Sequence, residues 1–252
     1  MFFTNLLEAN IRAKKLKFHF TYFPKTQSTN EDIWEIYNRE KKDGLFVITD
    51  NQTNGKGRHN NSWVSIPSKG ITCSFLLSQV FDEINFHSLL IPLAIVKGIK
   101  QFTGTTLDLK WPNDILYKNK KLAGVLIESK KNKDGYIFNI GIGINVNEET
   151  DDFPLYLKNE ISSLKMINNR SIQREPLLGC ILNELDHLII NADYSKLIKE
   201  WMQYCKHINK MIKFKNNNEY VNGIFKNINA SGQAVIEHNL KSIIYNGPIT
   251  LL

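Results

Sequence analysis

The stretch from residue 50 to residue 63 reads DNQTNGKGRHNNSW and combines two glycines with two nearby cations. Gly55 and Gly57 bracket Lys56, and Arg58 follows directly. Glycines let a backbone turn through positive φ and bring its N–H groups close to a ligand. Two cations beside them can neutralise a phosphate or a carboxylate. Taken alone, the stretch is also compatible with a charged surface turn, so its neighbours in the sequence decide.

Length and composition favour a globular protein of one large domain, or one domain with a small appendage. The chain has 252 residues, of which 42% are hydrophobic and 23% charged, and it contains no apolar run of the ~20 residues that a membrane span requires. The first residues also lack the pattern of a signal peptide. The cysteines are odd in number and far apart: Cys73, Cys180 and Cys205. Free thiols in a reducing compartment are therefore expected, which predicts a cytoplasmic protein without a protein-built metal site.

The net charge of +7 and the pI of about 9.1 leave two interpretations open. An acidic partner, either a nucleotide or an acidic protein surface, would explain the excess of lysine. Short lysine runs such as residues 118–121 and 130–133 are equally typical of solvated turns.

The patterning predicts an α+β fold in two parts. Alternating or β-branched runs predict strands at residues 16–23, 45–49, 71–77, 107–110, 115–117, 122–128 and 136–145. A polar N-cap at residues 28–30 followed by acidic residues predicts a helix that starts near residue 31. Helical spacing predicts further helices over residues 87–102, 173–191 and 194–205. After His207, short strands at 211–215, 219–226, 234–237 and 242–245 alternate with Asn- and Gly-containing turns. We expect a mixed sheet flanked by helices over residues 1–207 and a small β-barrel over residues 208–252.

A second polar motif, Lys110-Trp111-Pro112-Asn113-Asp114, stands at the end of a predicted strand. Pro112 removes a ladder donor, so the strand has to break there. Asn113 and Asp114 are then free to hold a ligand or a metal ion, although the same tripeptide is common in ordinary turns.

Two glycine-containing strands complete the set of motifs. Lys121 leads into a strand in which Gly124 leaves room for a ligand against the backbone. Residues 141–145 read GIGIN, but Val146 stands where a dinucleotide fingerprint needs a third glycine, and no amphipathic helix follows. The chain also lacks a P-loop. These glycines therefore indicate a strand that passes close to a bound ring.

In this order the motifs resemble the biotin–protein ligase family, and the resemblance runs from about Phe18 to the C-terminus. It rests on Ser28-Thr29-Asn30, Gln52…Gly55-Lys56-Gly57-Arg58…Trp63, residues 110–114, Lys121-Leu122-Ala123-Gly124 and residues 141–145. The resemblance implies a catalytic domain like that of class II aminoacyl-tRNA synthetases and biotin ligases, followed by an SH3-like barrel. It also implies that biotin and ATP form biotinyl-5'-adenylate, which then biotinylates a lysine of a biotin carboxyl carrier protein.

The resemblance also implies a role for each motif residue. Biotin would contact Ser28, Thr29, Asn30, Gln52, Gly55, Lys56, Gly57, Arg58, Lys121 and Gly124. The adenylate would contact Lys56, Arg58, Trp63, Lys110, Asn113 and Asn145. The catalytic residues would be Arg58, Lys121, Lys56 and Asp114. Mg²⁺ would accompany ATP, near Asp114, and the basic loop would order over the intermediate and exclude water.

The loop departs from the family pattern G-R-G-R-x-G-R-x-W. Lys56 replaces an arginine, which keeps the charge and loses the bidentate geometry. Asn60 and Asn61 stand where a glycine and an arginine are usual, so a third cation is missing. How tightly the adenylate is retained therefore stays open at this point.

Two other function classes remain alternatives. A lipoate or octanoate ligase or transferase would use a related fold, but the chain has no Gly-Gly pair of the kind typical of lipoate ligase loops. A non-enzymatic nucleic-acid-binding or regulatory module is supported by the charge alone. About 17 residues precede the first predicted strand, too few for a helix-turn-helix, so no DNA binding is expected. Nothing in the sequence selects between a monomer and a homodimer.

Overall fold

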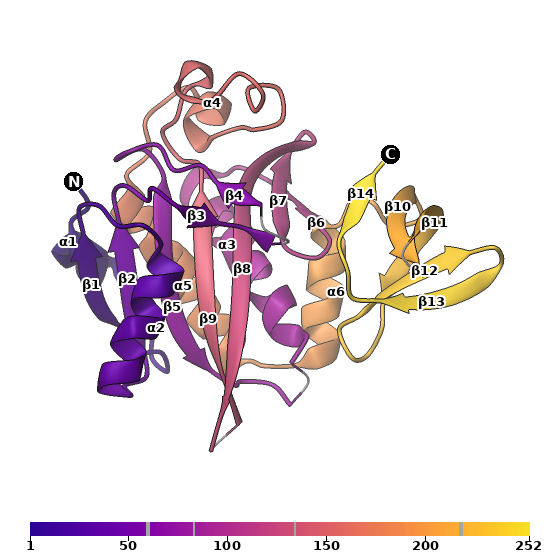
Figure 1. Cartoon of the computed structure of the whole chain (residues 1–252), viewed down its shortest axis with the longest axis horizontal. Helices are drawn as coiled ribbons and strands as arrows, with labels where there is room; N and C mark the ends of the chain where they lie inside the picture. Colours follow the sequence, from indigo (N-terminus) through magenta and orange to yellow (C-terminus); the bar gives the residue numbers. More distant parts are fainter. Residues whose placement is uncertain (59–60, 83, 134, 217–218) are drawn as a thin grey trace.

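The computed structural model describes residues 1–58, 61–82, 84–133, 135–216 and 219–252. Its centre is a seven-stranded sheet with the strand order β1-β2-β5-β9-β8-β7-β6 (Figure 1). The strands are β1 (His19–Phe23), β2 (Leu45–Thr49), β5 (Ile71–Ser78), β6 (Asp108–Lys110), β7 (Asp114–Tyr117), β8 (Lys120–Asn132) and β9 (Gly135–Ile144). β1 and β2 are parallel and the other neighbours antiparallel, which confirms the expected mixed sheet.

Helices cover both faces of this sheet. The helices are α1 (Thr4–Asn10), α2 (Thr29–Glu40), α3 (Phe86–Thr103), α4 (Leu164–Asn168), α5 (Arg174–Ile190) and α6 (Tyr194–Tyr204). α2 packs against β2, β5 and β9, and α3 packs against α5 and α6 on the opposite side (Figure 1). A Cβ atom added at Gly98 in α3 would lie 2.7 Å from the Cα of Ile181 in α5, so the two helices meet backbone to backbone. This layering leaves the α2 face of the sheet free for a site beside that helix.

Three glycines on the middle strands make a bare patch on that face. Gly124 in β8 pairs with Gly143 in β9, and Gly141 pairs with Leu126. Side chains alternate across a strand, so residues 141 and 143 point to one face of the sheet. The patch lets other groups approach the strand backbone closely.

The segment after β2 folds into a small hairpin that lies across β9 and β8 (Figure 1). It consists of β3 (Gly55–Lys56) and β4 (Ser62–Trp63), with Gly55 opposite Trp63. The sequence predicts a glycine-rich loop here, and the structure adds the two-stranded pairing. Asn60, one of the two residues that depart from the family pattern, lies outside the described residues.

The C-terminal part is a five-stranded sheet in the order β13-β12-β11-β10-β14. Its strands are β10 (Met211–Asn216), β11 (Glu219–Ile228), β12 (Ala234–His238), β13 (Lys241–Tyr245) and β14 (Ile249–Leu251). The sequence does not predict β14. The expected closed barrel is also corrected, because no pairing between β13 and β14 closes the sheet in the part of the chain that is described.

The C-terminal sheet packs against the end of the seven-stranded sheet. The indole Nε1 of Trp111 donates to the carbonyl oxygen of Gly247 over 3.1 Å, and the Trp111 ring lies 6.3 Å from that of Phe225. Among the described residues no helix combines the length and hydrophobicity needed to cross a bilayer.

Candidate functional site

A cavity of about 240 Å³ lies between the hairpin, the start of α2, the β6–β7 turn and the C-terminal sheet. Most residues singled out from the sequence line it. They are Thr29, Asn30, Gln52, Lys56, Gly57, Arg58, Trp63, Lys110, Asn113, Asp114, Lys121 and Gly124. Gly141 and Gly143 line the cavity as well, so residues from all five sequence motifs meet there.

Three of the predicted residues do not line the cavity. Ser28 is the buried N-cap of α2. Gly55 lies behind the cavity wall, where an added Cβ would stand 2.4 Å from the carbonyl oxygen of Trp63. The Asn145 side chain donates to the carbonyl oxygen of Ser162 over 3.0 Å and so braces a neighbouring loop. Direct ligand contacts for these three residues remain sequence-based predictions.

One end of the cavity is polar and is built by the start of α2. The backbone N–H of Thr29 donates to Oε1 of Gln52 over 2.9 Å, which fixes the orientation of that amide. Nε2 of Gln52 has no acceptor among the described residues, so it can donate to a ligand. Oδ1 of Asn30 lies against Gly141, where a Cβ would approach it to 2.2 Å. Small, oriented donors and acceptors in a slot of this kind recognise a compact polar head group.

The middle of the cavity is apolar, and Trp63 dominates it. Its indole lies on the glycine patch, because a Cβ at Gly143 would come within 2.3 Å of the ring and one at Gly124 within 3.6 Å. Ile142 and Leu126 also line this part. A flat apolar wall of this type suits a ring or an aliphatic chain.

The other end of the cavity carries charge. Lys121 Nζ lies 2.6 Å from one oxygen of Asp114, and Lys110 Nζ lies 3.5 Å from the other. Arg58 Nη1 donates to Oδ1 of Asn113 over 3.3 Å. Burial lowers the pKa of Arg58, while the charge of Asp114 acts against that shift. A guanidinium remains charged at neutral pH, and Arg58 forms no ion pair within the described residues. It is therefore available to an anionic ligand.

Lys56 is placed differently from Arg58. It is exposed at the rim, and its ammonium forms an ion pair with Glu31 of α2. The hydrogen bond with Glu31 raises the pKa of Lys56. Lys56 thus ties the hairpin to α2, and it would have to leave Glu31 before it could contact a ligand inside the cavity.

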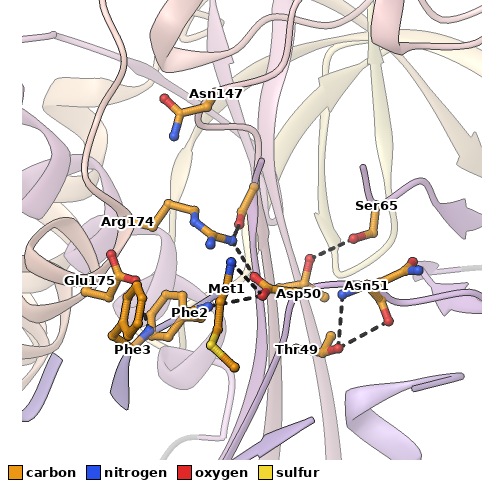
Figure 2. A network of polar contacts seen from close by, with 12 residues as sticks. Met1, Phe2, Phe3, Thr49, Asp50, Asn51, Ser65, Asn147, Arg174 and Glu175 are labelled. Atoms are coloured by element: carbon orange, nitrogen blue, oxygen red, sulfur yellow. Dashed lines mark hydrogen bonds and ion pairs between the residues drawn. The ribbon is translucent and has the colours of Figure 1, made fainter. Parts of the chain in front are cut away.

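The root of the hairpin loop is fixed by a buried ion pair, which Figure 2 shows from close by. Arg174 Nη1, at the start of α5, lies 2.9 Å from Asp50 and also donates to the carbonyl oxygen of Gly70 over 3.1 Å. Asp50 also accepts hydrogen bonds from the Tyr22 hydroxyl and the Phe2 N–H. Burial alone would raise the pKa of Asp50, but the hydrogen bonds from Tyr22 and Arg174 outweigh it and lower that pKa. One guanidinium therefore clamps both ends of the segment that covers the cavity.

The sequence does not predict several residues of the site. Pro248 and Ile249 of the C-terminal sheet line the cavity, and beneath its polar end lie Ser74, Glu128 and Asn139. In the sequence, Ser74 and Asn139 are polar residues within strongly apolar predicted strands, and this feature could have indicated the layer. The described residues hold no cluster of three or more His, Cys, Asp or Glu side chains that could bind a metal.

Comparisons with known proteins relate the region that builds the site to a known family. Residues 22–146 match the model of the Biotin/lipoate A/B protein ligase family. The bifunctional ligase/repressor BirA of Bacillus spizizenii is 36% identical over 167 residues, which are 65% of this chain and 51% of that protein. The biotin–protein ligase of Homo sapiens is 31% identical over 157 residues, 58% of this chain and 21% of that protein.

Solved structures agree at the level of the fold. The biotin protein ligase of Aquifex aeolicus in complex with biotin and ATP superposes with a TM-score of 0.79 at 23% identity, over 93% of this chain and 98% of that one. This chain spans about half the length (51%) of the Bacillus relatives that it matches. From the matched residues, the shared fold and the cavity that the matched motifs build, residues 22–146 of this chain belong to the Biotin/lipoate A/B protein ligase family.

Proposed function

We propose that this protein activates biotin with ATP to biotinyl-5'-adenylate and transfers the biotinyl group to a lysine of a biotin carboxyl carrier domain. The observation that carries the proposal is the order of groups along the cavity. A polar end at Gly141, an apolar wall at Gly143 and a charged end at Lys121 follow one another along β9 and β8. Biotin has the same order of parts, with a cyclic urea, a thioether ring with an aliphatic chain, and a carboxylate.

The first step joins two anions, a carboxylate and a triphosphate. Arg58 is half-buried and free of carboxylate partners within the described residues, so it would stabilise the charge that develops at the α-phosphate. Lys121 would hold the biotin carboxylate and orient it for attack on that phosphorus. Asp114 holds Lys121 in place over 2.6 Å.

Mg²⁺ would enter with ATP as part of that substrate and shield its phosphates. Asp114 is the carboxylate that lines the cavity, but both of its oxygens already face lysine ammonium groups. The residues present therefore do not fit a resident metal ion. This supports a metal that arrives and leaves with the nucleotide.

The second step needs a neutral amine and an acyl-adenylate protected from water. The hairpin and Trp63 cover the cavity, which would exclude solvent from the intermediate. Asp114 would receive the proton that the attacking amine loses once Lys121 has turned to the departing AMP. We further propose that residues 1–207 form the catalytic domain, that residues 208–252 form a second domain, and that the reaction takes place in the cytoplasm.

The polar end of the cavity supports biotin over lipoate or octanoate. Thr29, Asn30 and Gln52 offer oriented hydrogen-bonding groups. The dithiolane of lipoate and the alkyl chain of octanoate would leave these groups unpaired, and an unpaired buried polar group is unfavourable.

Incubation of the protein with ATP, Mg²⁺, a carrier domain and labelled biotin, lipoate or octanoate tests the assignment. We expect biotin-dependent release of diphosphate and a labelled carrier. Label from lipoate or octanoate alone would assign the protein to the other branch of the family. Absence of adenylate with every acid would leave a non-enzymatic binding module and refute the proposal.

A further inference from the structure

The polar end of the cavity rests on a second layer of side chains that do not line it. This layer consists of Ser74 on β5, Glu128 on β8 and Asn139 on β9. Ser74 lies opposite Gly141 in the sheet, and Asn139 lies opposite Glu128. Ser74 and Asn139 are fully buried. Buried polar groups in apolar strands are unfavourable unless they are hydrogen-bonded, so their partners indicate their purpose.

The hydrogen bonds of this layer run in one direction. The Ser74 hydroxyl donates to Oδ1 of Asn30 over 2.7 Å, and a carbonyl oxygen can only accept. Ser74 has one proton, so its Oγ can only accept in the 2.7 Å contact with Oγ1 of Thr29; the single proton of Thr29 goes either to Ser74 or to Oε1 of Gln52, 3.1 Å away. Nδ2 of Asn30 then points at Oε2 of Glu128, 3.5 Å away. The direction from Ser74 through Asn30 to Glu128 is therefore fixed by proton counting, and the Thr29 proton is used within the protein by one of its two acceptors.

Glu128 anchors the end of this chain of hydrogen bonds. Its Oε2 also accepts from the Trp34 indole over 2.9 Å and from Nδ2 of Asn139 over 3.2 Å. Nδ2 of Asn139 also donates to the backbone carbonyl of Asn30 over 2.9 Å. A carboxylate accepts only, so it prevents the Asn30 amide from turning over.

The direction of these hydrogen bonds determines which donors and acceptors face a ligand. Because the proton of Thr29 is used by Ser74 or by Oε1 of Gln52, Oγ1 of Thr29 presents lone pairs to the cavity. Gln52, whose Oε1 is held by the Thr29 N–H, presents its Nε2 donors. A ligand head group with one carbonyl acceptor beside N–H donors matches this arrangement.

We infer that Ser74 is a positioning residue that sets the donor and acceptor polarity of the head-group slot, and that Glu128 holds the far end of the same chain. The inference rests on the proposed function and deepens it, since it names the groups that make the slot select a cyclic urea over an analogue of reversed polarity. Ser74 does not touch the ligand and acts through Thr29 and Asn30.

The test compares biotin with 2-iminobiotin, in which an imino group replaces the ureido oxygen and a donor takes the place of an acceptor. Biotin-dependent diphosphate release is measured for the wild type, Ser74→Ala and Glu128→Gln, without a carrier. We expect each variant to lower the ratio of kcat/KM for biotin to that for 2-iminobiotin by about tenfold, the effect of one oriented hydrogen bond. The KM for ATP should stay unchanged, because the adenylate end is untouched.

Thr105→Val is the matched control. Thr105 is also buried, and its hydroxyl contacts Asn168 away from the cavity. This control should alter thermal stability and leave the ratio between the two acids unchanged. If Ser74→Ala fails to fold, Glu128→Gln provides the same readout, because it keeps the volume of the side chain.

The outcomes separate the two levels of the proposal. A wild-type protein that releases no diphosphate with biotin refutes the proposed function itself. An active wild type whose two variants lose activity equally with both acids shows that Ser74 and Glu128 have a merely structural role, and overturns this inference alone. A ratio that falls in both variants supports it.

Discussion

At the scale of single residues, the site separates two cations that look equivalent in sequence. Lys56 and Arg58 are two positions apart, yet Lys56 pairs with Glu31 at the rim while Arg58 is half-buried beside Asn113. A buried cation without an anion is unfavourable unless a ligand supplies one. We therefore expect the proposed chemistry to depend on Arg58 more than on Lys56.

We expect Arg58→Ala to lower the rate of adenylate formation by at least about 100-fold, the usual effect of removing one group that stabilises transition-state charge. The measurement is single-turnover formation of adenylate and its release into solution. Arg39→Ala, at an exposed position near the end of α2, is the control and should behave like the wild type. Unchanged biotinylation of the carrier by Arg58→Ala would refute the role of Arg58.

Glu148 allows a second prediction at this scale, which concerns stability. Its side chain is 2% exposed, and its Oε2 has no partner among the described residues. Burial raises the pKa of Glu148 to about 7, so folding is opposed once the pH exceeds the unfolded pKa of about 4.5. Glu148→Gln should stabilise the protein by up to about 3 kcal/mol at pH 8. The gain should shrink to under about 1 kcal/mol at pH 5. Urea unfolding at both pH values measures this, and an equal gain at both would contradict the assignment.

At the scale of elements, the hairpin that covers the cavity is stabilised by contacts with residues outside the hairpin. Two paired residues in each strand cannot hold a hairpin in water. The clamp of Arg174 on Asp50 and Gly70 joins the two ends of the segment to α5. Mutations more than 100 residues away in sequence should therefore alter ligand handling.

Arg174→Met should destabilise the protein by about 3–5 kcal/mol, because it leaves Asp50 buried without its main cation. The double variant with Asp50→Asn should recover part of that loss, and its KM for biotin should still exceed that of the wild type. Arg170→Met, at an exposed position just before α5, serves as control. Additive effects of the two substitutions in urea unfolding would contradict the pairing.

The contact between the two sheets can be tested by a matched pair of tryptophans. Trp111→Phe removes the donor to the Gly247 carbonyl, whereas Nε1 of Trp201 has no partner in the described part of the chain. We expect Trp111→Phe to cost about 1–3 kcal/mol more than Trp201→Phe. It should also increase hydrogen exchange at residues 245–249. Equal exchange in the two variants would show that the bond does not hold the sheets together.

At the scale of the whole molecule, the residues that line the cavity are easier to predict from the sequence than the residues that support them. The order of the Thr29, Gln52, Arg58, Asn113 and Lys121 motifs is enough to predict one shared cavity. Pairings between distant residues, such as Arg174 with Asp50, leave no local signal because each looks like an ordinary surface charge. β14 is also missed, since a three-residue strand after Pro248 has too little pattern of its own.

The pH dependence of folding is also a property of the whole molecule. Burial lowers the pKa values of His87 and His207 to about 4 each. A histidine whose folded pKa is depressed stabilises the fold above its unfolded pKa of about 6.5, and this stability is lost as the pH falls from there towards 4. Each histidine should account for about 2 kcal/mol of lost stability at pH 5.

Chemical unfolding of the wild type and of His207→Gln at pH 7.5 and pH 5 measures this loss. The variant should lose less stability between the two pH values than the wild type does. A parallel loss in both proteins would show that His207 does not contribute to the acid sensitivity.

The indole that lies on the glycine patch has a spectroscopic consequence. Trp34 and Trp111 are held by hydrogen bonds, and Trp201 is fully buried. Trp63 instead lies on bare backbone inside the cavity. An arriving ligand ring has to share that surface or displace the indole, so the intrinsic emission of the protein should change with occupancy of the cavity. Titration with biotin should alter the emission of the wild type, and the change should disappear in Trp63→Phe while Trp201→Phe, which changes a buried residue outside the cavity lining, retains it. The protein thereby carries its own optical probe for the order in which its substrates bind.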